Sequence, residues 1–251
     1  MSLAVVIITK NEEKNILRCL ESVEAFCDEI IVLDSFSTDR TKDVCSGYSK
    51  VKFFERAFDD YIQQKNFANS LVESNYILSL DADEYADSSL QKLIESREYE
   101  TYGAVQFLRI NFIENFSVRY GLWSRDVKIR LWKKELAKWS GSIPHEHIDL
   151  LPNTKILNSS AVINHNAYEN SQDLVLKAEK YALLAAKNYS SKSLALLTWS
   201  LLVNPIFKFF KGYILLQGYK DGKFGWEIAK VSFIETFKKY FYALKLKFQN
   251  N

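Results

Sequence analysis

The stretch that decides the fold is Tyr76-Ile77-Leu78-Ser79-Leu80-Asp81-Ala82-Asp83-Glu84, where a short apolar run ends in three acids. A run of bulky apolar side chains bounded by polar residues predicts a strand that is buried on both faces. Charged side chains do not continue into such a strand, so the acids are expected at its carboxyl end. In an open α/β sheet, ligands bind at that end of the strands.

The acids after this strand fit two interpretations. The carboxylates of Asp81 and Asp83 are oxygen ligands of the kind that Mg²⁺ and Mn²⁺ prefer, and such a metal can bind a diphosphate. The same residues also suit an acidic strand-to-helix turn in which an Asp caps the helix. The spacing alone does not choose between them, because short motifs often match by chance.

Three more apolar runs precede this strand, and stretches with helical spacing separate them. A helix is expected over Tyr61–Ser70, and apolar residues also recur at helical spacing from Ile16 to Val23. The expected strands are Leu3–Ile8, Ile30–Leu33, Val51–Phe54 and Tyr76–Leu80. The order β-α-β-α-β-α-β over about 80 residues predicts an α/β fold, with a parallel sheet and helices on both faces.

The pattern changes after a predicted helix over Ser88–Ser96. Strands are expected at Gly103–Phe112 and Lys128–Trp132, and residues 140–168, which hold all three histidines, look irregular. From Ser171 onward the chain looks helical. We therefore expect an α/β domain over residues 1–170 and a C-terminal helical region over residues 171–251.

Composition and charge narrow the class of protein. The chain has 47% hydrophobic and 25% charged residues, as globular proteins do, and its net charge of +2 does not indicate nucleic-acid binding. Its three cysteines lack the spacing of a zinc site and suit a reducing cytoplasm. Cys19 and Cys45 fall within predicted helices, so they are expected in the core rather than as nucleophiles. No signal peptide is visible, and no uninterrupted apolar run of about 20 residues predicts a spanning helix.

The end of the chain is locally basic. From Pro205 onward there are nine lysines against three acids, an excess of six positive charges in a chain whose total is +2. Lysines interleaved with aromatic residues at helical spacing are typical of a helix lying in a membrane interface. The alternative is an amphipathic helix packed on the domain with a solvated basic face. We favour the membrane interpretation because the basic excess is local and the aromatic density is high.

Several motifs taken together resemble family 2 glycosyltransferases. They are Val6-Ile7-Ile8-Thr9-Lys10-Asn11-Glu12, Asp34-Ser35-Phe36-Ser37-Thr38-Asp39, Gln64-Lys65-Asn66 and Leu80-Asp81-Ala82-Asp83-Glu84. Later motifs are similar to the lipopolysaccharide-core β-1,4-glucosyltransferase branch of that family. These are Arg130-Leu131-Trp132-Lys133-Lys134, Pro144-His145-Glu146, Phe210-Lys211-Gly212-Tyr213, Gly218-Tyr219-Lys220-Asp221-Gly222 and Gly225-Trp226.

The resemblance implies a GT-A-type (Rossmann-like) fold with a mixed, mainly parallel sheet, a nucleotide-sugar donor, and Mg²⁺ or Mn²⁺. It implies that Asp81 and Asp83 form the donor-ribose and metal motif, with Asp83 the better ligand, and that His165 is a late metal or diphosphate ligand. A structural role for His165 is the alternative. The residues implied to hold the nucleoside are Thr9, Asn11, Glu12 and Asp34, with a turn cap as the alternative for Asp34.

Basic residues and a catalytic base complete the implied site. Lys65 would approach the donor, and Arg125 and Arg130 would pair with phosphate, although Arg130 also suits a structural ion pair. An inverting transfer needs a base for the acceptor hydroxyl. The resemblance assigns Glu146 to this role, with Asp126 as the fallback and His145 orienting Glu146 or touching phosphate.

One position departs from the family pattern. The loop after the second strand usually has Gly where this chain has Phe36. If that position needs a positive φ, Phe36 is strained.

These features predict a cytoplasmic glycosyltransferase associated with the inner face of the cytoplasmic membrane. It would transfer a hexose, glucose from UDP-glucose, to a lipid-linked saccharide such as lipopolysaccharide core. Two alternatives stay open: a nucleotidyltransferase, although the chain lacks the Gly-rich loop that such an enzyme needs, and a catalytically inactive sugar- or lipid-binding scaffold. The oligomeric state is not predicted.

Overall fold

The structure, a computed structural model, describes residues 1–124, 126–142 and 145–249, with His145 described by its backbone alone. The chain forms two compact units. The first contains residues 1–109 and 126–166, and the second contains residues 110–124 and 167–249. This division differs from the expected boundary at residue 170, because the segment 110–124 belongs with the C-terminal helices.

The first unit begins with the alternation that the sequence predicts. Its strands and helices are β1 (Leu3–Thr9), α1 (Ile16–Val23), β2 (Glu29–Asp34), α2 (Thr41–Ser46), β3 (Val51–Glu55), α3 (Tyr61–Ser70) and β4 (Tyr76–Asp81). β1 pairs in parallel with both β2 and β4, and β2 pairs in parallel with β3. The stretch around Tyr76 is therefore one of the central strands, as expected.

Beyond β4 the sheet continues with antiparallel pairs. Its order is β3-β2-β1-β4-β8-β6-β11-β5, and β7 also pairs with β6. The added elements are β5 (Glu84–Ala86), α4 (Ser88–Ser96), β6 (Ala104–Ile113), β7 (Phe116–Ser117), β8 (Asp126–Lys133) and β11 (Ile156–Tyr168). A separate antiparallel hairpin is formed by β9 (Ala137–Ser142) and β10 (His145–Leu150).

The expectation that residues 140–168 are irregular is wrong, because β10 and β11 lie in this range. These strands contain many polar residues, and β11 buries only Ala161, Ile163 and Ala167. A strand that buries few of its side chains carries a weak hydrophobic signal, so the pairing that forms it is hard to read from the sequence.

The core of the first unit lies on both faces of the sheet. Alternate side chains of β1 point to opposite faces, so Val5 and Ile7 join a cluster with residues of α1 and α4, whereas Ala4 and Val6 join a cluster with residues of α3. Cys19 and Cys45 are buried in the first cluster, as expected. Burial raises the pKa of the Cys45 thiol to about 11, which suits a core residue rather than a nucleophile.

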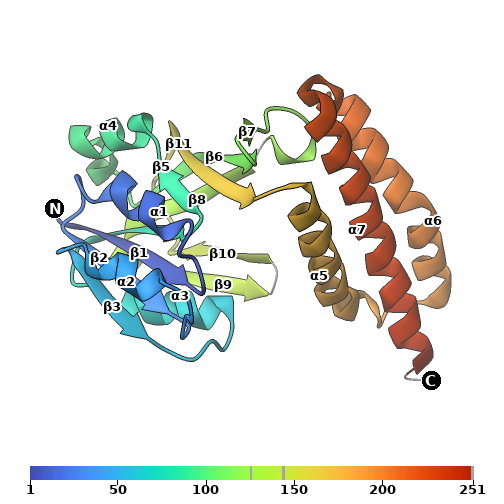
Figure 1. Cartoon of the computed structure of the whole chain (residues 1–251), viewed down its shortest axis with the longest axis horizontal. Helices are drawn as coiled ribbons and strands as arrows, with labels where there is room; N and C mark the ends of the chain where they lie inside the picture. Colours follow the sequence, from blue (N-terminus) through green and yellow to red (C-terminus); the bar gives the residue numbers. More distant parts are fainter. Residues whose placement is uncertain (125, 143–144, 250–251) are drawn as a thin grey trace. The chain divides into compact units, whose positions relative to one another are not determined.

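The second unit is built on three long helices, α5 (Ser171–Tyr189), α6 (Leu194–Phe210) and α7 (Gly222–Gln249). Figure 1 shows α7 lying between α5 and α6, and both pack against it. A π-helical turn, Lys211–Leu215, continues α6. Asp221, which is buried, accepts hydrogen bonds from the backbone nitrogens of Arg119 and Tyr120, so the segment 110–124 is fastened to these helices.

One result differs from the expectation that no helix could span a membrane. Among the described residues, the helical stretch Leu194–Leu215 is long and apolar enough to do so by length and composition, and 17% of its most apolar window is buried. α6 continues through Pro205, although proline removes one backbone hydrogen bond inside a helix. Length and composition alone do not show that the helix crosses a bilayer.

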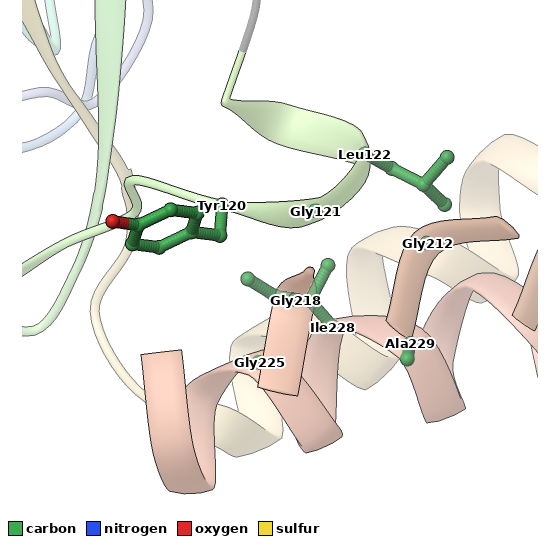
Figure 2. Close-up of a pocket in the computed structure, with 8 residues that line it drawn as sticks. All are labelled: Tyr120, Gly121, Leu122, Gly212, Gly218, Gly225, Ile228 and Ala229. Atoms are coloured by element: carbon green, nitrogen blue, oxygen red, sulfur yellow. The ribbon is translucent and has the colours of Figure 1, made fainter. Parts of the chain in front are cut away.

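Glycines allow the close packing at the base of these helices. Figure 2 shows Gly212, Gly218 and Gly225 lying against the segment Tyr120–Leu122. A Cβ atom added to Gly225 would lie 1.8 Å from the carbonyl oxygen of Gly218, and one added to Gly218 would lie 2.7 Å from the carbonyl oxygen of Gly212. The glycines of this tail motif are therefore explained by close contact between backbone atoms.

We expect Gly225→Ala to destabilise the chain by about 3 kcal/mol or more, because backbone atoms cannot yield to the added methyl group as a flexible side chain can. Thermal unfolding followed by circular dichroism measures the effect. Gly47→Ala is the matched control, since its added Cβ would meet its nearest atom at an ordinary 3.5 Å. Equal melting temperatures for the two variants would contradict this packing.

Candidate active site

The polar ends of three parallel strands lie together at one edge of the sheet. In the strand register, Thr9 is opposite Asp34, and Ile8 is opposite Asp81. The backbone nitrogen of Ser35 donates to the carbonyl oxygen of Thr9 at 2.9 Å. The sequence-predicted residues Thr9, Asp34 and Asp81 are therefore brought together.

The loops after β1 and β2 are joined by a dense set of hydrogen bonds. Asn11, which has a φ of 55°, donates from its backbone nitrogen to Ser37 Oγ at 2.7 Å, and its Oδ1 accepts from the backbone nitrogen of Thr38 at 2.8 Å. The backbone nitrogen of Glu12 donates to Thr41 Oγ1 at 2.9 Å. Asn11 and Glu12 thus shape the loop beside Asp34.

Asp34 is buried and accepts hydrogen bonds from both the backbone nitrogen and the hydroxyl of Ser37, at 2.6 and 2.5 Å. This is the geometry of the turn cap, and carboxylate oxygens still have capacity to accept a further donor. Between these residues Phe36 has a φ of 59° and is 53% exposed. The position does take the left-handed conformation that glycine adopts most easily, so Phe36 is strained there.

Asp81 lies between two buried cations. Its Oδ1 is 2.7 Å from Lys65 Nζ, and its Oδ2 accepts from Arg130 Nη2 at 2.8 Å. Burial by itself would raise the pKa of Asp81, but the charges of Lys65 and Arg130 hold it well below its ordinary value. Asp81 is therefore ionised and its carboxylate is already paired, which makes it a positioning group for Lys65 and Arg130 more readily than a metal ligand.

Glu84 extends this network into the sheet. It is fully buried, accepts from Arg130 Nη2 at 2.5 Å and from Arg109 Nη1 at 2.7 Å, and also accepts from the backbone nitrogen of Asp81. A buried carboxylate is tolerated only when it is paired in this way. Glu84 is thus the buried anion that holds Arg130 in place next to Asp81.

Asp126 belongs to the same network. It accepts two hydrogen bonds from Arg109, at 2.8 and 2.6 Å, and lies 3.3 Å from Lys128. Burial would raise the pKa of Asp126, but the charge of Arg109 lowers it below its ordinary value. A strongly paired carboxylate with a lowered pKa is a poor proton acceptor, which argues against Asp126 as a base.

Asp83 lies close to His165. Their nearest atoms, Asp83 Oδ2 and His165 Nε2, are 3.4 Å apart, and both side chains are partly exposed. Among the described residues no three His, Cys, Asp or Glu side chains form a complete metal cluster. Magnesium is commonly held by one or two carboxylates with the remaining positions filled by water and substrate phosphates. Asp83 and His165 fit such a partial site, which a bound diphosphate would complete.

Trp139 connects these charges to the β9–β10 hairpin. Its ring lies 4.2 Å from Lys65 Nζ and 5.7 Å from the guanidinium carbon of Arg130. Asn66, the residue after Lys65, holds Trp139 in place through two hydrogen bonds. Asn66 Nδ2 donates to the carbonyl oxygen of Trp139, and the backbone nitrogen of Trp139 donates to Asn66 Oδ1, both at 2.9 Å.

Glu146 lies on the same face of this hairpin as Trp139. Glu146 is opposite Gly141 and Ile148 is opposite Trp139, so alternation along the strands directs all four residues to one face. Diagonal neighbours of this kind are roughly 7 Å apart. Glu146 Oε2 is buried without a hydrogen-bond partner within the described part of the chain, and Gly141 offers it no side chain.

Several other predicted residues are placed less directly. His147 lies on the opposite face of the hairpin, where it is exposed and pairs with Asp149 at 3.0 Å. Arg125, Pro144 and the side chain of His145 lie outside the described residues. The roles predicted for Arg125 and His145 stay predictions.

Three residues of the site escaped sequence reasoning: Arg109, Trp139 and the buried Glu84. Arg109 is an arginine inside a predicted strand, a signal that could have indicated a buried ion pair. Two more buried polar atoms near Asp34, Thr9 Oγ1 and Gln64 Oε1, have no partner within residues 1–124, 126–142 and 145–249. Gln64 Nε2 donates to Ser35 Oγ at 3.1 Å, so this amide lies next to the Asp34 loop.

Comparison with solved structures defines the class of fold. The crystal structure of S. aureus TarS 1–349 matches with a TM-score of 0.50 and 14% sequence identity, covering 98% of this chain and 92% of that chain. The architecture is a GT-A-type fold with a C-terminal helical region, as the sequence predicts.

Comparison of sequences then gives the family. The model of Glycosyl transferase family 2 matches residues 4–150, more than half of the chain. An uncharacterized glycosyltransferase of Rickettsia felis is 29% identical over 252 residues, which cover 96% of this chain and 88% of the relative. The lipopolysaccharide core biosynthesis glycosyltransferase LpsC of Rhizobium meliloti is 34% identical over 98 residues, 38% of this chain and 36% of the relative. The chain belongs to glycosyltransferase family 2, which confirms the resemblance of its motifs.

Proposed function

We propose that this glycosyltransferase is an inverting hexosyltransferase that takes glucose from UDP-glucose and transfers it to a lipid-linked saccharide such as lipopolysaccharide core. The observation that carries the proposal is the arrangement at the edge of the parallel strands, where Asp81 lies between Lys65 and Arg130. Two fixed cations suit the diphosphate of a nucleotide sugar, because the chain has no glycine-rich loop that could bind phosphate through backbone nitrogens.

The nucleoside would lie along the loops after β1 and β2. Asp34 retains acceptor capacity for the base, and Asn11 and Glu12 hold the surrounding loop in shape. The unpartnered Thr9 Oγ1 and Gln64 Oε1 are available for polar atoms of the donor. These contacts support a donor with a polar base and ribose, and the uracil base is the choice that the family resemblance suggests.

The transfer itself would exchange one bond at the anomeric carbon. The acceptor hydroxyl oxygen forms a bond to this carbon from one side while the bond to the diphosphate oxygen breaks on the other side, so the configuration inverts. Glu146 takes the hydroxyl proton, and UDP leaves as the second product. The unpartnered Glu146 Oε2 supports this role, because a base must be free to accept a proton.

A divalent metal, Mg²⁺ or Mn²⁺, would be held by Asp83 and His165. Bound there, it would neutralise charge that develops on the departing diphosphate. Asp81 would contribute by keeping Lys65 and Arg130 in position rather than by binding the metal itself.

The acceptor and the location are proposed from the second unit. The named function of the Rhizobium relative supports a lipopolysaccharide acceptor. The exposed apolar helix α6 and the local excess of lysines support contact of the C-terminal region with the inner face of the cytoplasmic membrane. The acceptor would then be presented at the surface to which the enzyme is bound.

Calorimetry with UDP, with and without Mn²⁺, tests the donor site. We expect UDP to bind the full chain with a dissociation constant in the micromolar range and to bind at least tenfold more weakly without the metal, since the diphosphate would complete the coordination that Asp83 and His165 begin. ADP under the same conditions is the control for base recognition. No heat of UDP binding at millimolar concentrations would contradict the proposal and favour an inactive scaffold.

A further inference from the structure

A groove on the surface of the second unit lies between α6 and α7. It is lined by Ile206 and Phe209 from α6 and by Lys230 and Phe233 from α7, and it has a volume of about 290 Å³. The lining is apolar except for the lysine. Phe209 also packs edge-on against Trp226, with ring centroids 5.4 Å apart. The groove is thus hydrophobic, and Lys230 is the charged residue among those that line it.

The surface around the groove is also apolar. Trp199, Leu202 and Ile206 are each more than 60% exposed, and Phe210 is about half exposed. Their spacing of three and four residues places them along one side of α6. A contiguous exposed apolar surface on a monomer marks an interaction site.

Within the described residues, Lys230 differs from three neighbouring lysines in having no ion pair. Lysines 208, 223 and 238 of the same helices pair with Glu235, Glu227 and Glu179. Lys230 is exposed and has no ion pair within the described part of the chain. A free cation at an apolar groove suits a ligand with an anionic group and a hydrocarbon chain, as in an anionic phospholipid.

A second copy of this chain would suit the groove less well. The same region carries an excess of positive charge from Pro205 onward, so two such surfaces would repel each other. An anionic bilayer complements both the apolar side chains and the lysines.

We propose that this groove binds an anionic phospholipid of the bilayer, with an acyl chain between Ile206, Phe209 and Phe233 and the lipid phosphate paired with Lys230. The proposal rests on the proposed membrane contact and adds to it a specific lipid site. It predicts that membrane binding depends on one particular lysine more than on the number of lysines.

Flotation of the full chain with vesicles of phosphatidylglycerol and phosphatidylcholine in a 1:3 ratio, without donor sugar, tests the site. Lys230→Ala should weaken binding more than tenfold. Lys245→Ala is the matched control, because Lys245 is an exposed lysine of the same helix that does not line the groove. Its loss should weaken binding by about fivefold at most, the effect of one lysine near an anionic surface.

Binding of the wild-type chain distinguishes failure of the membrane contact from failure of the lipid site. If the wild-type chain does not float with anionic vesicles, the proposed membrane contact fails, and the lipid site fails with it. If the wild type floats and the two lysine variants weaken equally, the membrane contact stands and the lipid site is overturned.

Fluorescence with brominated phosphatidylglycerol gives a second measurement, which reports where the acyl chain lies rather than how tightly the protein binds. Trp226 lies against Phe209, so an acyl chain in the groove should quench it. We expect Trp226→Phe to remove a large part of the quenching, compared with Trp123→Phe. Quenching that is unchanged by Trp226→Phe would contradict occupancy of the groove.

Discussion

Glu146→Gln is expected to lower the turnover of glycosyl transfer by roughly a thousandfold, within the range of 10² to 10⁴ that a general base contributes. The substitution keeps the shape of the side chain and removes its ability to accept a proton. Because Glu146 Oε2 has no hydrogen-bond partner within the described residues, the change should not break a contact, and the melting temperature should not fall. Binding of UDP should also stay within about twofold of the wild type.

Asp149→Asn provides the matched control for this measurement. Asp149 lies on the same strand, β10, but it is exposed and pairs with His147 on the other face. Its variant should keep full turnover. If Glu146→Gln retains near wild-type turnover while Asp126→Asn loses it, the base is Asp126. That result would also require Asp126 to be released from Arg109 when substrate binds.

Asp83→Asn is expected to raise the concentration of Mn²⁺ needed for half-maximal activity by at least a hundredfold. The carboxylate is the stronger of the two candidate metal ligands, and an amide oxygen lacks the charge that a hard divalent cation prefers. The fold should not suffer, because Asp83 is partly exposed and lies 3.4 Å from His165 rather than in the buried ion-pair network. Activity titrated against Mn²⁺ measures the effect.

The single variant His165→Asn and the double variant Asp83→Asn/His165→Asn refine this test. If Asp83 and His165 hold the same ion, the effects of the two substitutions should be less than additive. Asp43→Asn, which changes an exposed carboxylate on α2, is the control and should leave the titration unchanged. A wild-type Mn²⁺ response in Asp83→Asn would show that the metal, if the reaction uses one, is held elsewhere.

Three parallel strands, β1, β2 and β4, could be predicted because they are buried on both faces. The edge strand β3 was predicted from its short apolar run, although none of its side chains is fully buried. Helical segments separate these strands, and the predicted bounds of Tyr61–Ser70 and Ser88–Ser96 agree with the structure. The antiparallel half was harder, because β10 and β11 bury few side chains and the sequence does not show which strand each would pair with.

The site residues that follow strand ends could be predicted from the sequence. The ion pairs that depend on the order of the strands in the sheet could not. Asp34 and Asp81 end β2 and β4, so their proximity follows from parallel pairing. The ion pairs of Glu84 with Arg109 and Arg130 form because β8 lies next to β4 and β6 lies next to β8. Nothing local in the sequence indicates that order.

Phe36 shows what the family resemblance added. The family pattern usually has glycine at this position, so the sequence predicted strain at Phe36 if the position needs a positive φ, and the structure has a φ of 59° there. The hydrogen bonds that join the Asn11 and Ser37 loops hold it in this conformation. Strain of this kind persists only where the surroundings enforce it, and it is common beside ligand sites.

The central claim is that acids and cations from β2, β4, α3 and β8 form one donor site at the edge of the sheet. A crystal structure of the full chain with UDP and Mn²⁺ tests it most directly. We predict the uracil beside Asp34, the diphosphate beside Lys65, and the anomalous signal of manganese next to Asp83. A nucleotide bound away from this edge, with Asp34 and Asp83 both untouched, would contradict the account.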